Sequence, residues 1–154
     1  VGVSIYSFSD LDGICLENIK LVQIPISLYD QRILKDNLYE HLTKRKISIH
    51  ARSIFLQGLL LTSHRKWPNY IPPDFVNHHK KLVNSLKKKS LLEISLDFIL
   101  SCKFIETALI GVTSLKELEE IVFCLKKIKL NSKNDYSHLA WNNSSDLDPR
   151  LWNK

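Results

Sequence analysis

Hydrophobic residues recur along this chain with two alternating spacings, a period of two residues and a period close to 3.6 residues. Segments with strand character occupy residues 1–7, 21–28, 47–55 and 105–112, and a stretch with helical spacing follows each of them. Strands that alternate with helices predict a parallel sheet with helical crossovers. Four such units are half of an eight-stranded (β/α)8 TIM barrel, so we expect an α/β fold with an incomplete barrel.

The expected helices have recognisable starts. Ser9 is the expected N-cap of the first helix, and the second is marked by leucines at helical spacing, Leu34, Leu38 and Leu42. Two later helices open with capping boxes, Ser90 to Glu93 and Ser114 to Glu117. A helix at about residues 75–88 lies between them in the chain and has the composition of a mostly exposed helix.

Three of the expected helices have an apolar stripe that we predict to be buried. The stripes are Leu11, Ile14, Cys15 and Ile19 in the first helix, Leu92, Leu96 and Ile99 after the first capping box, and Leu115, Leu118, Ile121, Val122 and Leu125 after the second. Each stripe would face the sheet.

Two segments depart from the alternation of strands and helices. A long loop after Leu61 contains Trp67-Pro68 and Pro72-Pro73, and loops of this length are often lids or binding loops. After Leu130 the chain becomes polar, but its tryptophans predict that it packs back on the body. We therefore expect a barrel half over residues 1–130 and a packed tail over residues 131–154.

Composition indicates a soluble globular protein, because 44% of the residues are hydrophobic and 25% are charged. No apolar run is long enough to span a membrane, and we expect neither a membrane partner nor a signal peptide. The first residue already lies in a strand pattern and the chain has no Met, so we expect it to begin inside a fold. Its three cysteines form no C-x-x-C motif, which predicts buried free thiols and a cytoplasmic protein.

The net charge is +6, and the lysines and arginines gather in three clusters, 44–46, 87–89 and 126–129. Each cluster falls at the end of a helical pattern, where cations complement the helix dipole. No aromatic residues are interleaved with the clusters, so a nucleic-acid partner is not expected, although a basic single-strand binder remains a distant alternative. The histidines His50, His64, His78 and His79 have no metal-ligand spacing, and we expect them to be solvated, with no metal site.

Three segments in order along the chain resemble one known family. They are Gly2-Val3-Ser4-Ile5-Tyr6, the stretch from Ala51 to Leu60, and the stretch from Gly111 to Glu120. Together they resemble the C-terminal half of the aldo-keto reductases, in particular a bacterial branch, and the sequence Val22-Gln23-Ile24-Pro25 fits between the first two. The resemblance implies that these are parallel strands five to eight of the barrel, with their helices, and that the N-terminal half of the same barrel is a partner.

The resemblance also implies a binding site for NADP or NAD. Ser4 and Gln23 correspond to residues that hydrogen-bond the nicotinamide carboxamide, although the usual Asn beside Ser4 is Ile5 here. An amide side chain can donate and accept at once, which suits that role for Gln23. Arg52 stands where many members stack a Tyr on the nicotinamide ring, and a planar guanidinium can also stack.

The remaining cofactor residues implied by the resemblance lie in two loops. Ser53, Phe55, Gln57 and Gly58 match the loop along the pyrophosphate. Around the eighth strand, the implied contacts are Gly111, Ser114 at a helix N-terminus, and Glu120 near adenine. Glu117 stands where many members have an Arg for the 2′-phosphate of NADPH, and Ile121 replaces a usual Asn, so the choice between NADPH and NADH stays open.

The catalytic groups of the family, a Tyr acid with Lys, Asp and His, resemble residues of strands that this chain does not contain. Tyr6 and Tyr29 are not promoted to that role. The resemblance implies part of an NAD(P)H-dependent oxidoreductase that reduces an aldehyde or ketone, with this segment supplying the cofactor cradle and no catalytic residue. The alternative is a non-catalytic half-barrel that serves as a binding or structural module.

Overall fold

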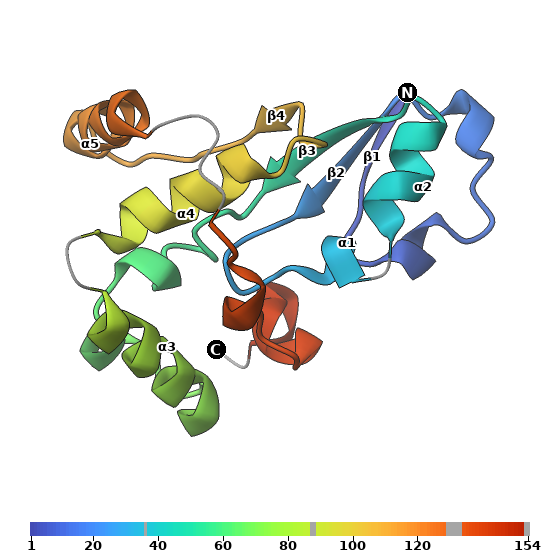
Figure 1. The fold of residues 1–154 in the computed structure, drawn as a ribbon. Helices are drawn as coiled ribbons and strands as arrows, with labels where there is room; N and C mark the ends of the chain where they lie inside the picture. The colour runs from blue at the N-terminus through green and yellow to red at the C-terminus, as the bar shows by residue number, and fades with distance from the viewer. Residues whose placement is uncertain (36, 87–88, 129–133, 153–154) are drawn as a thin grey trace.

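The computed structural model describes residues 1–35, 37–86, 89–128 and 134–152. Its centre is a four-stranded sheet in the order β1-β2-β3-β4 (Figure 1). The strands are β1 (Gly2–Ser4), β2 (Leu21–Pro25), β3 (Ser48–Arg52) and β4 (Thr107–Ala108). Every neighbouring pair is parallel, which confirms the α/β class and the parallel sheet.

Helices follow the second, third and fourth strands. They are α1 (Arg32–Lys35), α2 (Leu38–Lys44), α3 (Pro73–Ser85), α4 (Leu91–Ser101) and α5 (Leu115–Lys127). Figure 1 shows α1, α2 and α4 on one side of the sheet, with α5 beside α4 and α3 below it. The layers are those of a barrel wall, with strands inside and helices outside.

The register of the sheet separates its residues into two faces. Val3, Val22 and Ile49 lie side by side, and Val22 and Ile49 are buried under the helices. The opposite face carries Gly2, Ser4, Leu21, Gln23, Ser48, His50 and Arg52, all of which are partly or fully exposed. This second face is polar and remains open among the described residues, as the inner face of an unclosed barrel wall would be.

Each strand is shorter than the alternation predicted. β2 ends at Pro25 instead of Leu28. The pairing of β2 with β1 stops at Gln23, so the proline stands where β1 no longer needs a backbone donor. β4 has two paired residues instead of the eight expected at residues 105–112. Leu109 N donates to Ala51 O at 2.8 Å, and the chain then leaves the sheet.

The prediction of a helix after the first strand is wrong. The structure has short 3-10 turns at Phe8–Leu11 and Leu16–Asn18, and Ser7, not Ser9, caps the first turn. The Asp10 carboxylate accepts hydrogen bonds from the backbone nitrogens of Tyr6 and Ser7 at 2.7 and 3.0 Å. Gly13, at φ 78°, turns the chain before a helix can extend.

The second helix of the prediction is divided into α1 and α2. Asn37 precedes α2 in the left-handed conformation, at φ 50°, which interrupts the helical path. Of the three leucines that marked this helix, Leu38 and Leu42 are buried, and Leu34 is partly buried and packs against the core.

The capping box at Ser90 is confirmed, and Leu96 and Ile99 of α4 are buried as predicted. The buried face predicted for α5 is wrong, except at Ile121. Leu115, Leu118 and Val122 are 70%, 44% and 41% exposed, and Leu125 is also exposed. The described part of the chain contains no element that covers this face.

The long segment at residues 62–72 is anchored instead of open. Trp67 is buried, and its indole N–H donates to the carbonyl oxygens of Leu59 and Thr62, both at 3.0 Å. The helix α3 is less exposed than predicted, because Phe75, His79 and Leu82 are buried. His79 therefore contradicts the expectation of solvated histidines.

The polar tail packs on the body, as its tryptophans predicted. The Trp141 backbone N–H donates to Tyr29 O at 2.9 Å, and the Trp141 ring lies 5.1 Å from that of Phe75. Trp152 donates from its indole N–H to Asp146 O at 2.9 Å. Residues 131–133 and 153–154 of the tail lie outside the described residues.

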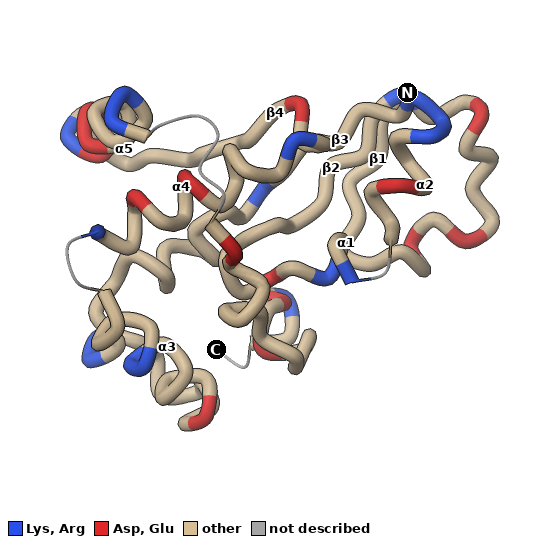
Figure 2. Tube along the Cα trace, in the orientation of Figure 1, with Lys and Arg blue, Asp and Glu red and all other residues tan. Residues whose placement is uncertain are grey.

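The positions of charged residues are spread over the fold, as Figure 2 shows, and four aspartates are buried, Asp30, Asp97, Asp146 and Asp148. The cluster at 44–46 falls at the end of α2, and Lys126 and Lys127 fall at the end of α5, as predicted. Lys87, Lys88 and Lys129 lie outside the described residues. None of the described helices combines the length and hydropathy that crossing a membrane requires.

The three cysteines are free but differ in burial. Cys102 is buried, Cys124 is intermediate and Cys15 is exposed. The prediction of buried thiols is therefore wrong for Cys15, because the expected helix around it is replaced by turns.

Candidate functional site

The candidate site is a cavity of about 690 Å³ at the carboxyl ends of β3 and β4. In parallel α/β sheets, ligands bind at this edge, because the loops after the strands meet there. The lining residues are Arg52, Ser53, Ile54, Phe55, Gln57 and Gly58 from the loop after β3, and Leu109, Ile110, Gly111, Val112, Thr113 and Glu117 from the segment after β4.

The loop after β3 has an unusual backbone. Ser53, Leu56 and Gln57 have positive φ angles of 56°, 48° and 55°, and Gly58 follows at 84°. Left-handed conformations cost non-glycine residues about 1–2 kcal/mol each, and such strain concentrates at functional sites. The turns are held by local hydrogen bonds, including Leu56 N to Ser53 O at 2.8 Å. These hydrogen bonds fix the conformation of the loop. Its backbone strain is by itself a reason to consider the loop a candidate binding element.

Open space adjoins the glycines of both loops. A Cβ atom at Gly58 or Gly111 would meet no described atom within 4 Å. A ligand can therefore approach the backbone closely at both positions. This favours a flat or extended group lying along the two loops.

Arg52 connects the ends of β3 and β1. Its Nη2 donates to Ile5 O at 3.1 Å, and its guanidinium carbon lies 4.1 Å from the centroid of the Tyr6 ring. Arg150 of the tail lies over the same ring at 3.6 Å and pairs with Asp148 at 2.6 Å. The salt bridge with Arg150 keeps the pKa of Asp148 below its usual value.

Ser4 and Gln23 lie side by side on the open face of the sheet. They are partners in the register between β1 and β2, and Ser4 Oγ donates to Gln23 Oε1 at 3.3 Å. Neither belongs to the lining of the cavity, but both lie on the face that also carries Arg52. The sheet thus brings together the two residues predicted to hold one amide group.

The N-terminus of α5 closes one side of the cavity. Ser114 Oγ accepts from Glu117 N at 3.2 Å, and the Glu117 carboxylate accepts from Thr113 N at 2.7 Å. In the predicted capping box, the Glu117 side chain would accept from the backbone N–H of Ser114. It accepts instead from that of Thr113, one residue earlier. Hydrogen bonds from the backbone and hydroxyl of Thr113 lower the pKa of Glu117. A fixed negative charge therefore stands where an anion would otherwise bind.

The structure brings most of the predicted site residues to one place. Arg52, Ser53, Phe55, Gln57, Gly58 and Gly111 line the cavity. Ser114 is the N-cap of α5 next to it, whereas Glu120 is an exposed residue farther along the helix.

Tyr6 and Arg150 are the neighbours that sequence reasoning missed. Arg150 belongs to a tail whose path depends on distant packing, so no local pattern could place it beside Tyr6. Tyr29 is fully buried and its hydroxyl is 2.8 Å from His79 Nδ1, in the core and not in the cavity.

Comparison with known proteins agrees with the parallel α/β fold. The model of the Aldo/keto reductase family matches residues 1–138. The fold is similar to the holo and apo structures of aldo-keto reductase AKR11C1 from Bacillus halodurans, each with a TM-score of 0.70 at 19% sequence identity. The similarity covers 90% of this chain but only 48% of that protein, so the chain spans about half the length of its structural relative. A search of curated proteins found no match.

The family match extends over all four strands and their helices, from the open polar sheet face to the loops around the cavity. This chain belongs to the aldo/keto reductase family.

Proposed function

We propose that the chain forms strands five to eight of an aldo/keto reductase barrel and holds NADP or NAD at the carboxyl edge of its sheet. Residues 1–130 form the barrel half and residues 131–154 a tail packed on it. The N-terminal half of the barrel supplies the remaining strands and the catalytic acid. The complete site reduces an aldehyde or ketone.

The observation that carries this proposal is the strained loop after β3. Three of its non-glycine residues adopt left-handed conformations. The same loop faces a cavity with open space at Gly58 and Gly111. A cavity of about 690 Å³ lies within the common range for small-molecule sites, roughly 300–1,000 Å³. These features fit the extended pyrophosphate portion of a dinucleotide.

Each residue of the proposed cradle has a role that its chemistry allows. Ser4 and Gln23 hold the nicotinamide amide, because their side chains can both donate and accept. Arg52 supplies a planar surface for the ring. The loop from Ser53 to Gly58 and the N-terminus of α5 at Ser114 lie along the phosphates. Nicotinamide, when bound, supplies hydride to a carbonyl carbon.

Glu117 supports a second candidate, a non-catalytic half-barrel module. Its carboxylate accepts the Thr113 backbone N–H, which an anionic ligand could otherwise use. It would also repel a 2′-phosphate. If this charge prevents nucleotide binding altogether, the sheet serves as a scaffold and not as a cofactor site.

Titration of NADPH and NADH against the full-length protein, followed by fluorescence, tests the two candidates. We expect saturable binding of at least one nucleotide. The variant Gln57→Glu places a carboxylate at the exposed tip of the loop and should weaken binding about ten-fold or more, an effect equivalent to about 1.4 kcal/mol. The matched variant Asn77→Asp, on an exposed position of α3, should leave it unchanged.

Glu117→Gln keeps an acceptor for Thr113 but removes the charge. It should strengthen NADPH binding more than NADH binding, because only NADPH carries the extra phosphate. Absence of binding by either nucleotide would favour the non-catalytic module. Equal weakening by Gln57→Glu and Asn77→Asp would contradict the placement of the site.

A further inference from the structure

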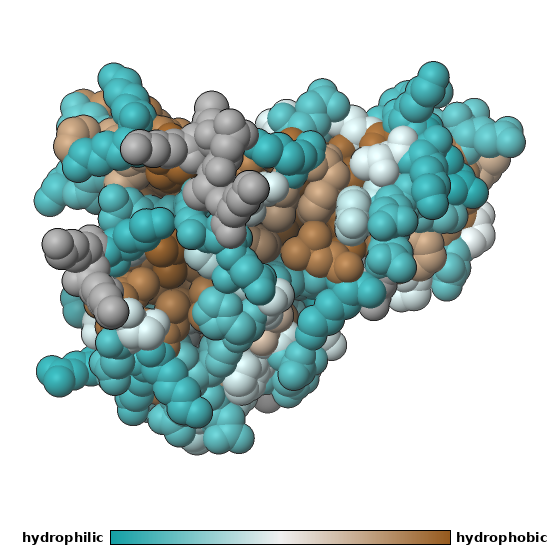
Figure 3. All heavy atoms as spheres, viewed as in Figure 1, coloured by the Kyte–Doolittle hydropathy of each residue, from teal (hydrophilic) through white to brown (hydrophobic). Residues whose placement is uncertain are grey.

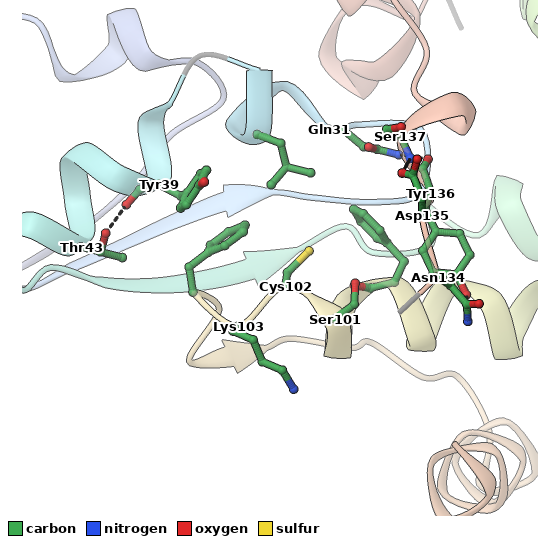
Figure 4. A pocket seen from close by; sticks show the side chains of 13 residues that line it. Gln31, Tyr39, Thr43, Ser101, Cys102, Lys103, Asn134, Asp135, Tyr136 and Ser137 are labelled. Carbon is green, nitrogen blue, oxygen red and sulfur yellow. Dashed lines mark hydrogen bonds between the residues drawn. The ribbon is translucent and has the colours of Figure 1, made fainter. Parts of the chain in front are cut away.

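A second cavity lies on the helix side of the sheet. It is a groove of about 560 Å³ between α2 and α4, closed at one end by the tail (Figure 4). The hollow between α4 and the α1–α2 segment exposes hydrophobic atoms, as Figure 3 shows. The groove shares no lining residue with the cavity at the carboxyl edge.

Aromatic rings form two sides of this groove. Tyr39 of α2 and Phe104 stack with their centroids 4.5 Å apart and their planes at 25°. Phe98 of α4 and Tyr136 of the tail meet edge to face at 6.0 Å. Leu34 and Cys102 add apolar surface between them. Ring faces and edges arranged in this way favour an aromatic occupant.

Gln31 provides one directional polar group. The residue is 3% exposed, and its Nε2 donates to Leu28 O at 2.7 Å and to Tyr136 O at 2.8 Å. Both bonds use the amide nitrogen, and Oε1 has no hydrogen-bond partner among the described residues. In the part of the chain that the structure describes, every side-chain nitrogen or oxygen that is fully buried has a hydrogen-bond partner. Gln31 Oε1 has none, so it is not fully buried, and Gln31 lines the groove.

The other polar groups of the groove do not indicate a catalytic site. Thr43 and Ser101 donate to backbone carbonyls of their own helices, at 2.8 and 2.6 Å. Burial raises the pKa of Cys102 to about 11, so its thiol stays protonated at neutral pH. Lys103, Asn134, Asp135 and Ser137 also line the groove, so it combines an apolar aromatic surface with polar groups, among which Gln31 Oε1 is an acceptor on a buried side chain.

From these contacts we propose that the groove between α2 and α4 binds a small aromatic molecule that carries a hydroxyl or N–H donor. The ring lies between the Tyr39–Phe104 and Phe98–Tyr136 pairs, and the donor reaches Gln31 Oε1. The lining residues all belong to this chain's own helices, turns and tail. The proposal does not depend on the cofactor site or on completion of the barrel.

Equilibrium dialysis with two matched probes tests the proposal. 2-Naphthol has a bicyclic ring and a hydroxyl donor, and 2-methoxynaphthalene has the same ring without the donor. We expect 2-naphthol to bind one site about five-fold more tightly, the effect of about one hydrogen bond. Equal affinity of the two probes, or no binding of 2-naphthol at millimolar concentration, would overturn the proposal.

Two variants locate the binding. Gln31→Met keeps the side-chain length but removes the acceptor, so the preference for 2-naphthol should disappear, whereas Gln57→Met at the other cavity should preserve it. Phe104→Leu removes one ring and should weaken both probes. If circular dichroism shows that Gln31→Met does not fold, the affinity of Phe104→Leu for the two probes tests the site instead. Unchanged affinity in Phe104→Leu would contradict the site.

Alkylation of the cysteines locates the binding site of 2-naphthol independently. Iodoacetamide modification at mildly alkaline pH, at which 2-naphthol keeps its hydroxyl proton, is followed by peptide mass spectrometry. It reports Cys102 in the groove and exposed Cys15, which does not line it, in the same sample. Saturating 2-naphthol should slow the modification of Cys102 several-fold and leave that of Cys15 unchanged. An equal effect on both cysteines, or none on Cys102, would show that the probe binds elsewhere.

Discussion

The centre of the sheet and its perimeter differ in how completely they are packed. β2 and β3 pair over five residues, and Val22, Ile49 and Ala51 are at most 1% exposed. β1 and β4 are short, have one unpaired side each within the described chain, and lie next to exposed apolar residues. The centre resembles a finished domain core, whereas the perimeter resembles a surface that still has to be covered.

The exposed apolar residues of the perimeter bear on our proposal that this chain is half of a barrel. Leu109 and Val112 after β4, and Leu115 and Phe123 of α5, are 40–70% exposed. Their helical and strand patterns are those of buried residues. The partner that buries them in our account is the other half of the barrel.

The largest expected effect of the open perimeter is on oligomeric state. Open parallel edges and exposed apolar residues promote pairing between chains. The isolated 154-residue chain should therefore self-associate or be poorly soluble. Light scattering combined with thermal unfolding measures this directly. A monomer with one sharp melting transition would contradict the view that the perimeter is less completely packed than the centre.

Two phenylalanines allow the packing of the centre and the perimeter to be compared by their effects on the free energy of unfolding. Phe75 is fully buried between Tyr29, Trp67 and Trp141, so Phe75→Ala should lower the free energy of unfolding by about 3–5 kcal/mol. Phe123 is 59% exposed, and Phe123→Ala should change it by less than about 0.5 kcal/mol. Denaturant unfolding of both variants gives the two values. Similar losses would mean that α5 is already packed in this chain.

The core also contains a titratable group whose charge opposes folding. Burial, with the nearby His64 and His78, lowers the pKa of His79 from 6.5 to about 4. The unfolded chain therefore takes up a proton at a higher pH than the folded chain. Stability from this group is complete above about pH 6.5 and decreases by about 3 kcal/mol as the pH falls to about 4.

Unfolding free energies measured between pH 4 and pH 7 check this slope. His79→Gln removes the titration, keeps a hydrogen-bonding side chain for the Tyr29 hydroxyl, and should flatten the profile. An unchanged slope in His79→Gln would assign the pH dependence to other groups.

A smaller effect separates the two glycines of the candidate site. Gly58 has φ 84°, so Gly58→Ala should cost about 1 kcal/mol of stability although the space beside it is open. Gly111 has ordinary φ and the same open space, so Gly111→Ala should change stability by less than about 0.5 kcal/mol. Thermal unfolding distinguishes them. Equal costs would mean that the loop conformation is not strained as described.

The sequence pattern predicted the parallel sheet and the presence of four helical segments, because the spacing of hydrophobic residues distinguishes strands from helices. It failed where burial depends on something outside the element. The pattern of α5 is that of a buried helix, but burial needs a partner. The stretch after β1 has helical spacing, yet Gly13 and the Asp10 turn prevail over it.

The candidate site divides in the same way. Ser4, Gln23 and the loop from Arg52 to Gly58 follow from the family resemblance. Strand order explains only why they lie toward one edge, because parallel strands place their carboxyl ends there. The positive φ angles at Ser53 and Gln57 could not be predicted, because serine and glutamine do not favour the left-handed conformation. The contact between Arg150 and Tyr6 depends on how the tail folds back, which no local spacing encodes.

Hydrogen–deuterium exchange of the full-length protein, with and without saturating NADPH or NADH, tests the central claim most directly. We predict slower exchange in peptides that cover residues 52–58 and 110–117, with no change in residues 98–104 of the groove. Protection confined to other segments, or no protection at either loop, would contradict a dinucleotide site at this edge of the sheet.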